Sequence, residues 1–204
     1  MFKQMNVMTK SSTVKKSLVI VVSSPSGGGK TTIISETLKK IPGIRRSISY
    51  TTRAMREGEI NGKDYRFISE PDFKKRIQEN SFVEYEKIFD NYYGTSIEDI
   101  EDARKAGEDI VLSIDVKGAK KIKEKYSESI SIFIMPPSIE ELTSRLKKRN
   151  TECVRQFSLR IKESAKEIAA SDAYDYMIVN NDLGTAIDEF IGIIERERKL
   201  AVKF

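Results

Sequence analysis

The chain has 204 residues, enough for one compact domain with a sizeable core. Its hydrophobic content of 39% and charged content of 33% are typical of a globular protein and exclude a disordered or fibrous chain. No apolar run approaches the roughly 18 residues that a membrane span needs, so we expect no membrane partner. The one cysteine, Cys153, excludes an internal disulfide and is expected to be a free thiol. Because the chain has no histidine, a catalytic thiol would lack an imidazole base.

The positive charge is concentrated at the N-terminus. Of the net charge of +5, residues 1–16 contribute four lysines and no acidic residue: Lys3, Lys10, Lys15 and Lys16. The remaining residues hold 32 basic and 31 acidic side chains, so the body of the protein is nearly neutral. We therefore interpret 1–16 as a flexible basic tail rather than a nucleic-acid-binding arm, and we expect no nucleic-acid partner. The tail lacks the apolar segment of a secretory signal.

Short apolar runs alternate with helical patterns along the rest of the chain. Residues 18–23 predict a buried strand, and a glycine-rich turn follows. A helix is predicted over 30–41, where apolar residues recur at helical spacing: Ile33, Ile34, Leu38 and Ile41. Further buried strands are predicted at 110–114, 130–135 and 176–180. This order predicts an α/β protein with a parallel sheet covered by helices on both faces.

Two sequence patterns resemble helix starts. Ser96-x-x-Asp99 resembles a capping box before a helix that stops at Gly107, and Ser138-x-x-Glu141 is a second such pattern. The last helix is predicted from an apolar face made of Ile187, Ile191 and Ile194.

Two stretches interrupt the alternation. Residues 47–95 are rich in threonine, arginine, tyrosine and glycine and predict a small mixed α and β insertion. Residues 140–167 are helical in pattern, strongly charged and interrupted near Asn150-Thr151, which predicts a second insertion.

The glycine-rich turn is a candidate phosphate-binding loop. Ser24-Pro-Ser-Gly-Gly-Gly-Lys-Thr31 stands between a predicted strand and a predicted helix and matches the Walker A pattern at seven of eight positions, with Ser24 in place of glycine. Its backbone N–H groups and the helix N-terminus would bind ATP phosphates, Lys30 would reach the β- and γ-phosphates, and the Thr31 hydroxyl would ligate Mg²⁺. The expected ATP-binding residues are Ser24, Pro25, Ser26, Gly27, Gly28, Gly29, Lys30, Thr31 and Thr32. A glycine turn that precedes Lys-Thr by chance is the alternative.

A second motif follows in the insertion, at 49–67. It reads Ser-Tyr-Thr-Thr-Arg-Ala-Met-Arg-Glu-Gly-Glu, then Gly62-Lys-Asp-Tyr-Arg-Phe. Here the chain resembles the guanylate kinases, and further matches follow at 82–85, 92–95, 114–115, at Arg145 and Arg149, and at 179–180. The resemblance spans about 17–200. It implies a P-loop NTPase-type core of 17–47, 99–139 and 168–204, a GMP-binding region at 48–98 and a lid at 140–167.

The residue chemistry of the acceptor site fits this family. Arg53 and Arg56 lie three residues apart and can converge on a phosphate dianion, while Tyr65 and Tyr93 can add hydroxyl donors. A carboxylate accepts both the N1–H and the 2-amino group of guanine, and Glu84 is the family-matched carboxylate. The GMP-binding residues implied by the resemblance are Ser49, Arg53, Arg56, Tyr65, Glu84, Tyr93, Thr95 and Asp115. A solvated basic loop and a surface carboxylate are the alternatives.

Three arginines of the second insertion match the lid arginines of the family. Arg145 and Arg149 share a helix face, and Arg160 lies three turns further on. With Lys30 and Arg53 they form the expected catalytic set. A solvated basic helix is the alternative. Asn180 matches the region where the family holds adenine, although Asp182 beside it can equally be a helix N-cap.

The chain departs from the family pattern at three positions. Ser113 stands where the family usually has an acidic residue, Asn150 where it commonly has glycine, and Asn181 where it has aspartate. We expect activity to survive the change at Ser113, because Thr31 and Asp115 are present. Asn150 is expected to alter the dynamics of the lid, and the effect of Asn181 is expected to be mild.

The resemblance implies a cytoplasmic enzyme that transfers the γ-phosphate of ATP to GMP, and to dGMP, with Mg²⁺. Its partners would be these small molecules, and it would be a monomer or a homo-oligomer. Two alternatives stay open. One is a guanylate-kinase-like module that binds proteins without catalysis, which is disfavoured because Lys30, Thr31 and the lid arginines are all present. The other is a related P-loop kinase with a different phosphate acceptor.

Overall fold

The core of the protein is one five-stranded parallel sheet. The computed structural model describes residues 17–88, 90–148 and 154–201, without the side chains of 146, 148 and 154–160; the proposed tail at 1–16 lies outside this range. The strand order is β2-β7-β1-β8-β9. The bounds are β1 Val19–Ser23, β2 Ile44–Arg46, β7 Asp109–Ser113, β8 Ile130–Met135 and β9 Tyr176–Val179. All four neighbouring pairs are parallel, which confirms the predicted α/β architecture.

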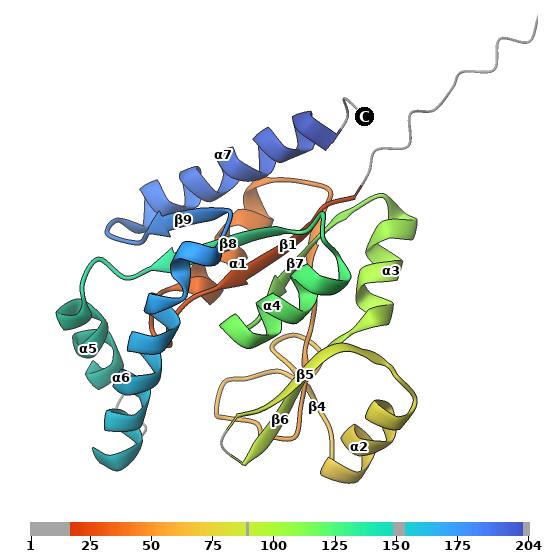
Figure 1. Ribbon diagram of the computed structural model, residues 1–204, viewed down its shortest axis with the longest axis horizontal. Coiled ribbons are helices and arrows are strands. Elements are labelled where there is room, and N and C mark those ends of the chain that lie inside the picture. The colour runs from red at the N-terminus through yellow and green to blue at the C-terminus, as the bar shows by residue number, and fades with distance from the viewer. Residues whose placement is uncertain (1–16, 89, 149–153, 202–204) are drawn as a thin grey trace, which may run out of the picture.

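Helices cover both faces of this sheet (Figure 1). One face packs with α1 (Lys30–Lys40) and α7 (Leu183–Ala201) around a cluster that includes Ile20, Ile33 and Phe190. The other face packs with α3 (Ile97–Ala106) and α4 (Val116–Lys125) around a cluster that includes Leu112 and Ile122. Alternate residues of the central strand β1 enter the two clusters, which is why the strand reads as an uninterrupted apolar run. The predicted strands and helices at these positions are confirmed.

The two predicted capping boxes have different outcomes. Ser138 caps α5 (Ile139–Lys148), because its Oγ accepts a hydrogen bond from the Glu141 N–H at 3.1 Å. Ser96 is the N-cap residue of α3 and the helix stops at Gly107, as predicted, but the Ser96 side chain makes no capping hydrogen bond, so the capping box itself is wrong. The Asp99 carboxylate instead accepts hydrogen bonds from the Ser47 hydroxyl at 2.8 Å and from Arg66. It therefore joins the core to the insertion rather than closing its own helix.

The insertion forms a second sheet beside the core (Figure 1). Its strands lie in the order β4-β3-β6-β5, with β3 and β4 parallel and the other pairs antiparallel. The elements are β3 Tyr50–Thr51, β4 Arg66–Phe67, α2 Glu70–Gln78, β5 Phe82–Ile88 and β6 Asn91–Ser96. A small aromatic core of Tyr50, Phe73 and Phe82 holds α2 against this sheet. The second insertion consists of α5 and α6 (Val154–Ala169), and the interruption predicted near 150–151 lies outside the described residues.

Within the described ranges, no helix is both long enough and apolar enough to cross a membrane.

A buried ion pair fastens α7 to the edge of the core. The Asp109 carboxylate is fully buried, accepts the Leu18 N–H at 2.9 Å, and accepts Arg198 Nε at 2.6 Å. We expect Arg198→Ala to lower the free energy of unfolding by about 3–5 kcal/mol, because it removes the guanidinium that pairs with a buried carboxylate. Arg45→Gln is the matched control, since the Arg45–Glu108 ion pair is exposed and contributes at most about 1 kcal/mol. Urea unfolding of both variants measures the difference, and equal losses would contradict the prediction.

Candidate active site

The loop between β1 and α1 has a backbone that requires glycine. Gly27 and Gly29 have φ values of 91° and 100°, which side chains other than glycine rarely adopt. At Gly29 a Cβ would lie 2.1 Å from Asn180 Nδ2, so the loop has no room for one. Gly29 is also the N-cap residue of α1, which brings the helix N-terminus to the loop. The arrangement can hold phosphate oxygens against backbone N–H groups.

Asn180 fixes this loop from the end of β9. Its Nδ2 donates to the Gly28 carbonyl at 2.8 Å, and its own N–H donates to the Met135 carbonyl at 2.8 Å. Arg145 approaches from α5, with Nη2 3.4 Å from the Asn180 carbonyl and Nε 2.9 Å from the carboxylate of Glu141. The neighbouring Asp182 accepts the Thr185 N–H at 2.8 Å and so caps α7, as the alternative prediction had it.

Lys30 lies over the carboxyl end of β7. Its Nζ donates to the Ile114 carbonyl at 3.0 Å. Burial lowers the pKa of Lys30 to about 8, and the negative charges of Glu167 and Asp115 oppose that shift. Thr31 follows on the first turn of α1 with an exposed side chain. The site thus combines a half-buried lysine with an accessible hydroxyl at the same helix N-terminus.

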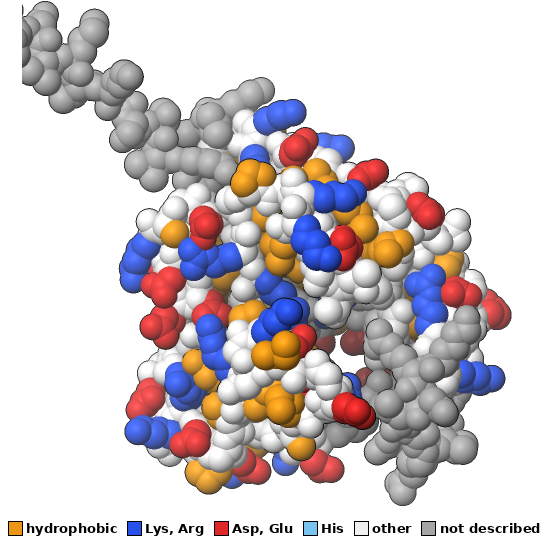
Figure 2. Space-filling view, turned by 180° about the vertical axis from the view of Figure 1, so that it is seen from behind, with side chains coloured by type: hydrophobic (Ala, Val, Ile, Leu, Met, Phe, Trp, Pro, Cys, Tyr) orange, Lys and Arg blue, Asp and Glu red, His pale blue; other side chains and the backbone are white. Residues whose placement is uncertain are grey.

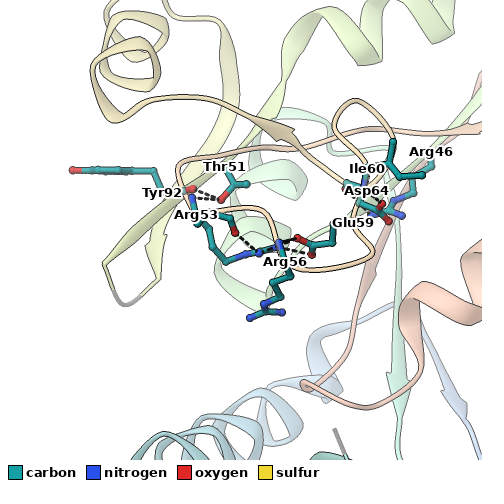
Figure 3. A network of polar contacts seen from close by, with 9 residues as sticks. Arg46, Thr51, Arg53, Arg56, Glu59, Ile60, Asp64 and Tyr92 are labelled. Atoms are coloured by element: carbon teal, nitrogen blue, oxygen red, sulfur yellow. Dashed lines mark hydrogen bonds and ion pairs between the residues drawn. The ribbon is translucent and has the colours of Figure 1, made fainter. Parts of the chain in front are cut away.

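Arg53 is held in a fixed orientation by the loop that follows it. Glu59 accepts its guanidinium in a bidentate pair, at 2.7 and 3.0 Å, and also accepts the Arg56 N–H at 2.8 Å. The hydrogen bond from Arg53 is the main reason that the pKa of Glu59 is lowered. The side chain of Arg56 is exposed and points away from this pair (Figure 3). One arginine of the motif is therefore preorganised and the other is free to move toward a ligand.

Two tyrosines complete this cluster. The rings of Tyr65 and Tyr93 are 5.9 Å apart in an edge-to-face contact, and the Arg53 guanidinium lies 5.4 Å from the Tyr65 ring centroid. Burial raises the pKa of Tyr65, so its hydroxyl remains a donor at neutral pH. The structure thus brings together three of the four residues that we predict to bind the acceptor phosphate.

Glu84 and Thr95 face each other across β5 and β6. The Thr95 hydroxyl donates to Glu84 Oε1 at 2.5 Å, and Glu84 is only 7% exposed. The strand register shifts between Phe82 and Glu84, which turns this carboxylate inward. Burial raises the pKa of Glu84 to about 7, the Thr95 hydrogen bond opposes the shift, and the charge of Asp115 adds to it. The carboxylate is therefore costly to ionise until it gains further donors.

The neighbouring helix α4 is shaped around this carboxylate. A Cβ at Gly118 would lie 3.0 Å from Glu84 Oε2, so glycine makes room for it. Asp115 is the N-cap of α4 and accepts the Gly118 N–H at 2.8 Å, a structural role that we did not predict. Ser49 is the last of the predicted GMP-binding residues. It is half-buried, and its carbonyl accepts the Arg66 N–H at 2.9 Å.

Two charged residues near the site were not singled out from the sequence. Glu167, on α6, is close enough to Lys30 and Asp115 to interact with both, and burial raises its pKa to about 7. Arg46 ends β2 and approaches the loop of Asp64 (Figure 3). Glu167 and Arg46 both stand in basic or mixed-charge stretches, which are typical of a solvent-exposed surface. The local sequence therefore does not identify them as residues near the site.

The arginines that we predict to form the lid are only partly located. Arg149 lies outside the described residues, and Arg160 is placed only as a backbone position in α6. On the face opposite to that of Figure 1, the surface beside the insertion is hollowed, and acidic side chains are visible inside the hollow (Figure 2).

A parallel sheet of this order, with a glycine loop and lysine between its central strand and a helix, defines a P-loop nucleotide-binding protein. The family model described as guanylate kinase matches residues 16–197. The guanylate kinase of Geobacter metallireducens is 43% identical over 169 residues, which are 83% of each chain. That of Caldanaerobacter subterraneus is 43% identical over 187 residues, 92% of this chain and 91% of the relative. This chain belongs to the guanylate kinase family and is a kinase.

A solved structure agrees with this assignment. The crystal structure of guanylate kinase from Anaplasma phagocytophilum superimposes with a TM-score of 0.75 at 34% sequence identity, over 90% of this chain and 87% of that chain. The predicted P-loop NTPase-type fold is thereby confirmed.

Proposed function

We propose that the protein transfers the γ-phosphate of ATP to GMP, and to dGMP, giving ADP and GDP in the cytoplasm. Membership of the guanylate kinase family supports phosphorylation of GMP in general. The buried pair of Glu84 and Thr95 supports guanine as the base of the acceptor nucleotide. A buried carboxylate beside a hydroxyl matches the two adjacent donors of guanine, and adenine cannot supply that pair.

The donor side of the proposed site is the loop 24–32. Its N–H groups and Lys30 would hold the ATP phosphates, with Asn180 keeping the loop in shape. Mg²⁺ in such sites is held by few protein ligands, substrate phosphates and water. The exposed Thr31 hydroxyl would be one such protein ligand. The described residues contain no group of three or more His, Cys, Asp or Glu side chains that could hold a metal ion. When bound, the ion would neutralise charge on the β- and γ-phosphates.

The acceptor side is the insertion. Arg53, fixed by Glu59, would bind the GMP phosphate together with Tyr65 and Tyr93, and the exposed Arg56 would close onto it. Glu84 would accept from guanine, with Ser49, Thr95 and Asp115 around the base. No general base is required, because the attacking phosphate oxygen is already ionised. Arg145, Arg149 and Arg160 would neutralise charge on the transferred group and exclude water.

The KM for GMP is expected to rise as the pH falls below about 7. Guanine donates to the ionised form of Glu84, whereas the raised pKa of about 7 means that free Glu84 takes up a proton below that pH. Each pH unit below 7 then costs up to about tenfold in GMP affinity. Glu84→Gln is the control, because it keeps the ionisation of GMP itself but removes the side-chain carboxyl. Equal pH profiles of the two proteins would contradict the prediction.

The reaction is tested by ADP release from Mg-ATP with GMP, dGMP, AMP, UMP, CMP and dTMP offered separately. We expect turnover with the two guanine nucleotides at least about 10³-fold above the others, because a buried carboxylate without its donors rejects the other bases. Turnover centred on another nucleotide would indicate a related kinase. A folded protein that binds GMP but transfers nothing would indicate a non-catalytic binding module.

A further inference from the structure

Arg46 is the last residue of the edge strand β2, opposite Val111 of β7. Its side chain reaches across to the insertion, where Nη2 lies 3.4 Å from the Asp64 carbonyl (Figure 3). Asp64 immediately precedes Tyr65, one of the residues proposed to bind the acceptor phosphate. Arg46 therefore links the core sheet to the loop that carries an acceptor-site residue.

The charge of Arg46 is not compensated within the described part of the chain. Its Nε is buried and has no hydrogen-bond partner there, and no carboxylate of those residues forms an ion pair with it. Two other arginines of this region are paired, Arg45 with Glu108 and Arg53 with Glu59. A half-buried guanidinium whose Nε lacks a hydrogen-bond partner is stabilised when an anion completes its surroundings.

The charge of Arg46 acts on two functional groups, one on each side of the proposed transfer. Burial is the main influence on the pKa values of Lys30 and Tyr65, and the positive charge of Arg46 lowers both. Arg46 is thus within electrostatic reach of the lysine at the ATP phosphates and of the tyrosine at the GMP phosphate. Phosphoryl transfer brings the donor and acceptor phosphates together, so a cation within electrostatic reach of both Lys30 and Tyr65 acts on both anions.

We propose that Arg46 is a positioning residue for the acceptor, which holds the Tyr65 loop on the core and draws the GMP phosphate toward Lys30 with its uncompensated charge. The inference rests on the proposed function and adds a residue to it. It requires no direct contact between Arg46 and GMP. A purely structural role would depend on the hydrogen bond to the Asp64 carbonyl and not on the charge.

Three substitutions separate the charge from the hydrogen bond. Arg46→Lys keeps both, Arg46→Gln keeps a donor without charge, and Arg46→Met keeps neither. Arg45→Gln is the matched control on the same strand. We expect Arg46→Gln and Arg46→Met to raise the KM for GMP about 10- to 50-fold, while Arg46→Lys stays within about threefold of the wild type. The KM for ATP is expected to change less than about threefold in every variant.

Several results would overturn the inference. If Arg46→Gln has the same KM for GMP as Arg46→Lys and only Arg46→Met has a raised KM, the hydrogen bond to the Asp64 carbonyl explains the role of Arg46 without its charge. If all three variants resemble Arg45→Gln, Arg46 has no role in acceptor binding. If urea titrations show that the neutral variants do not fold, Arg46→Lys is the deciding variant. A rise of more than about tenfold in its KM for GMP would contradict a role carried by charge. A wild-type protein that does not phosphorylate GMP would instead refute the proposed function, independently of Arg46.

Discussion

Replacement of Lys30 by alanine is expected to lower kcat/KM for the transfer by about 10²–10³-fold, the usual cost of removing a fixed group that stabilises developing charge. Lys30 is the first residue of α1, and its Nζ lies at the carboxyl end of β7, 3.0 Å from the Ile114 carbonyl. The glycine loop would still bind phosphates through its N–H groups. The loss is therefore expected in kcat more than in the KM for ATP.

The same substitution is expected to leave the protein folded. Burial lowers the pKa of Lys30 to about 8, below its ordinary value of 10.5, so the folded state binds this proton less tightly than the unfolded state does. At pH 7 the charged lysine thus opposes folding, and its removal costs at most one hydrogen bond. Urea titration and steady-state kinetics of Lys30→Ala measure both quantities, with Lys30→Met as a longer apolar control. Retained turnover in a folded variant would contradict the assignment of the phosphate loop.

The core strands could be predicted because each is a continuous apolar run that packs against helices on both faces. β2 was missed for the opposite reason. It is a three-residue strand, Ile44–Arg46, that contains two arginines and exists because its backbone pairs with β7. Short edge strands of this kind carry no local pattern, since only the neighbouring strand stabilises them.

The candidate site shows the same division. Chemical types at fixed spacing predict the phosphate loop and the arginine motif. The local sequence does not show which hydrogen-bond partner a polar side chain takes in the folded protein. Asp99, for example, accepts hydrogen bonds from Ser47 and Arg66, where a capping box was expected. The partial burial of Glu167 and of the Arg46 Nε arises only when α6 and the insertion fold against the core. Such residues become visible only in three dimensions, because their surroundings come from distant parts of the chain.

Glu84→Gln is expected to raise the KM for GMP by about 10²-fold while the KM for ATP changes little. Glutamine keeps one acceptor oxygen but turns an amide N–H₂ group toward a guanine donor, so one hydrogen bond is lost and two donors are opposed. Unfolding does not account for the loss. The raised pKa of about 7 means that ionised Glu84 opposes folding above that pH, and glutamine removes this penalty.

Two comparisons make this prediction specific. Glu86→Gln applies the same chemical change two residues further along β5, to a carboxylate that pairs with Lys121 at 2.6 Å, and is expected to leave the KM for GMP unchanged. IMP lacks the 2-amino group, so the wild type should discriminate against it and Glu84→Gln should lose most of that discrimination. If Glu84→Gln still prefers GMP over IMP as strongly as the wild type does, guanine is read elsewhere, and Ser49 and Asp115 become the residues to test next. If the two nucleotides become nearly equivalent, one buried carboxylate accounts for the choice of base.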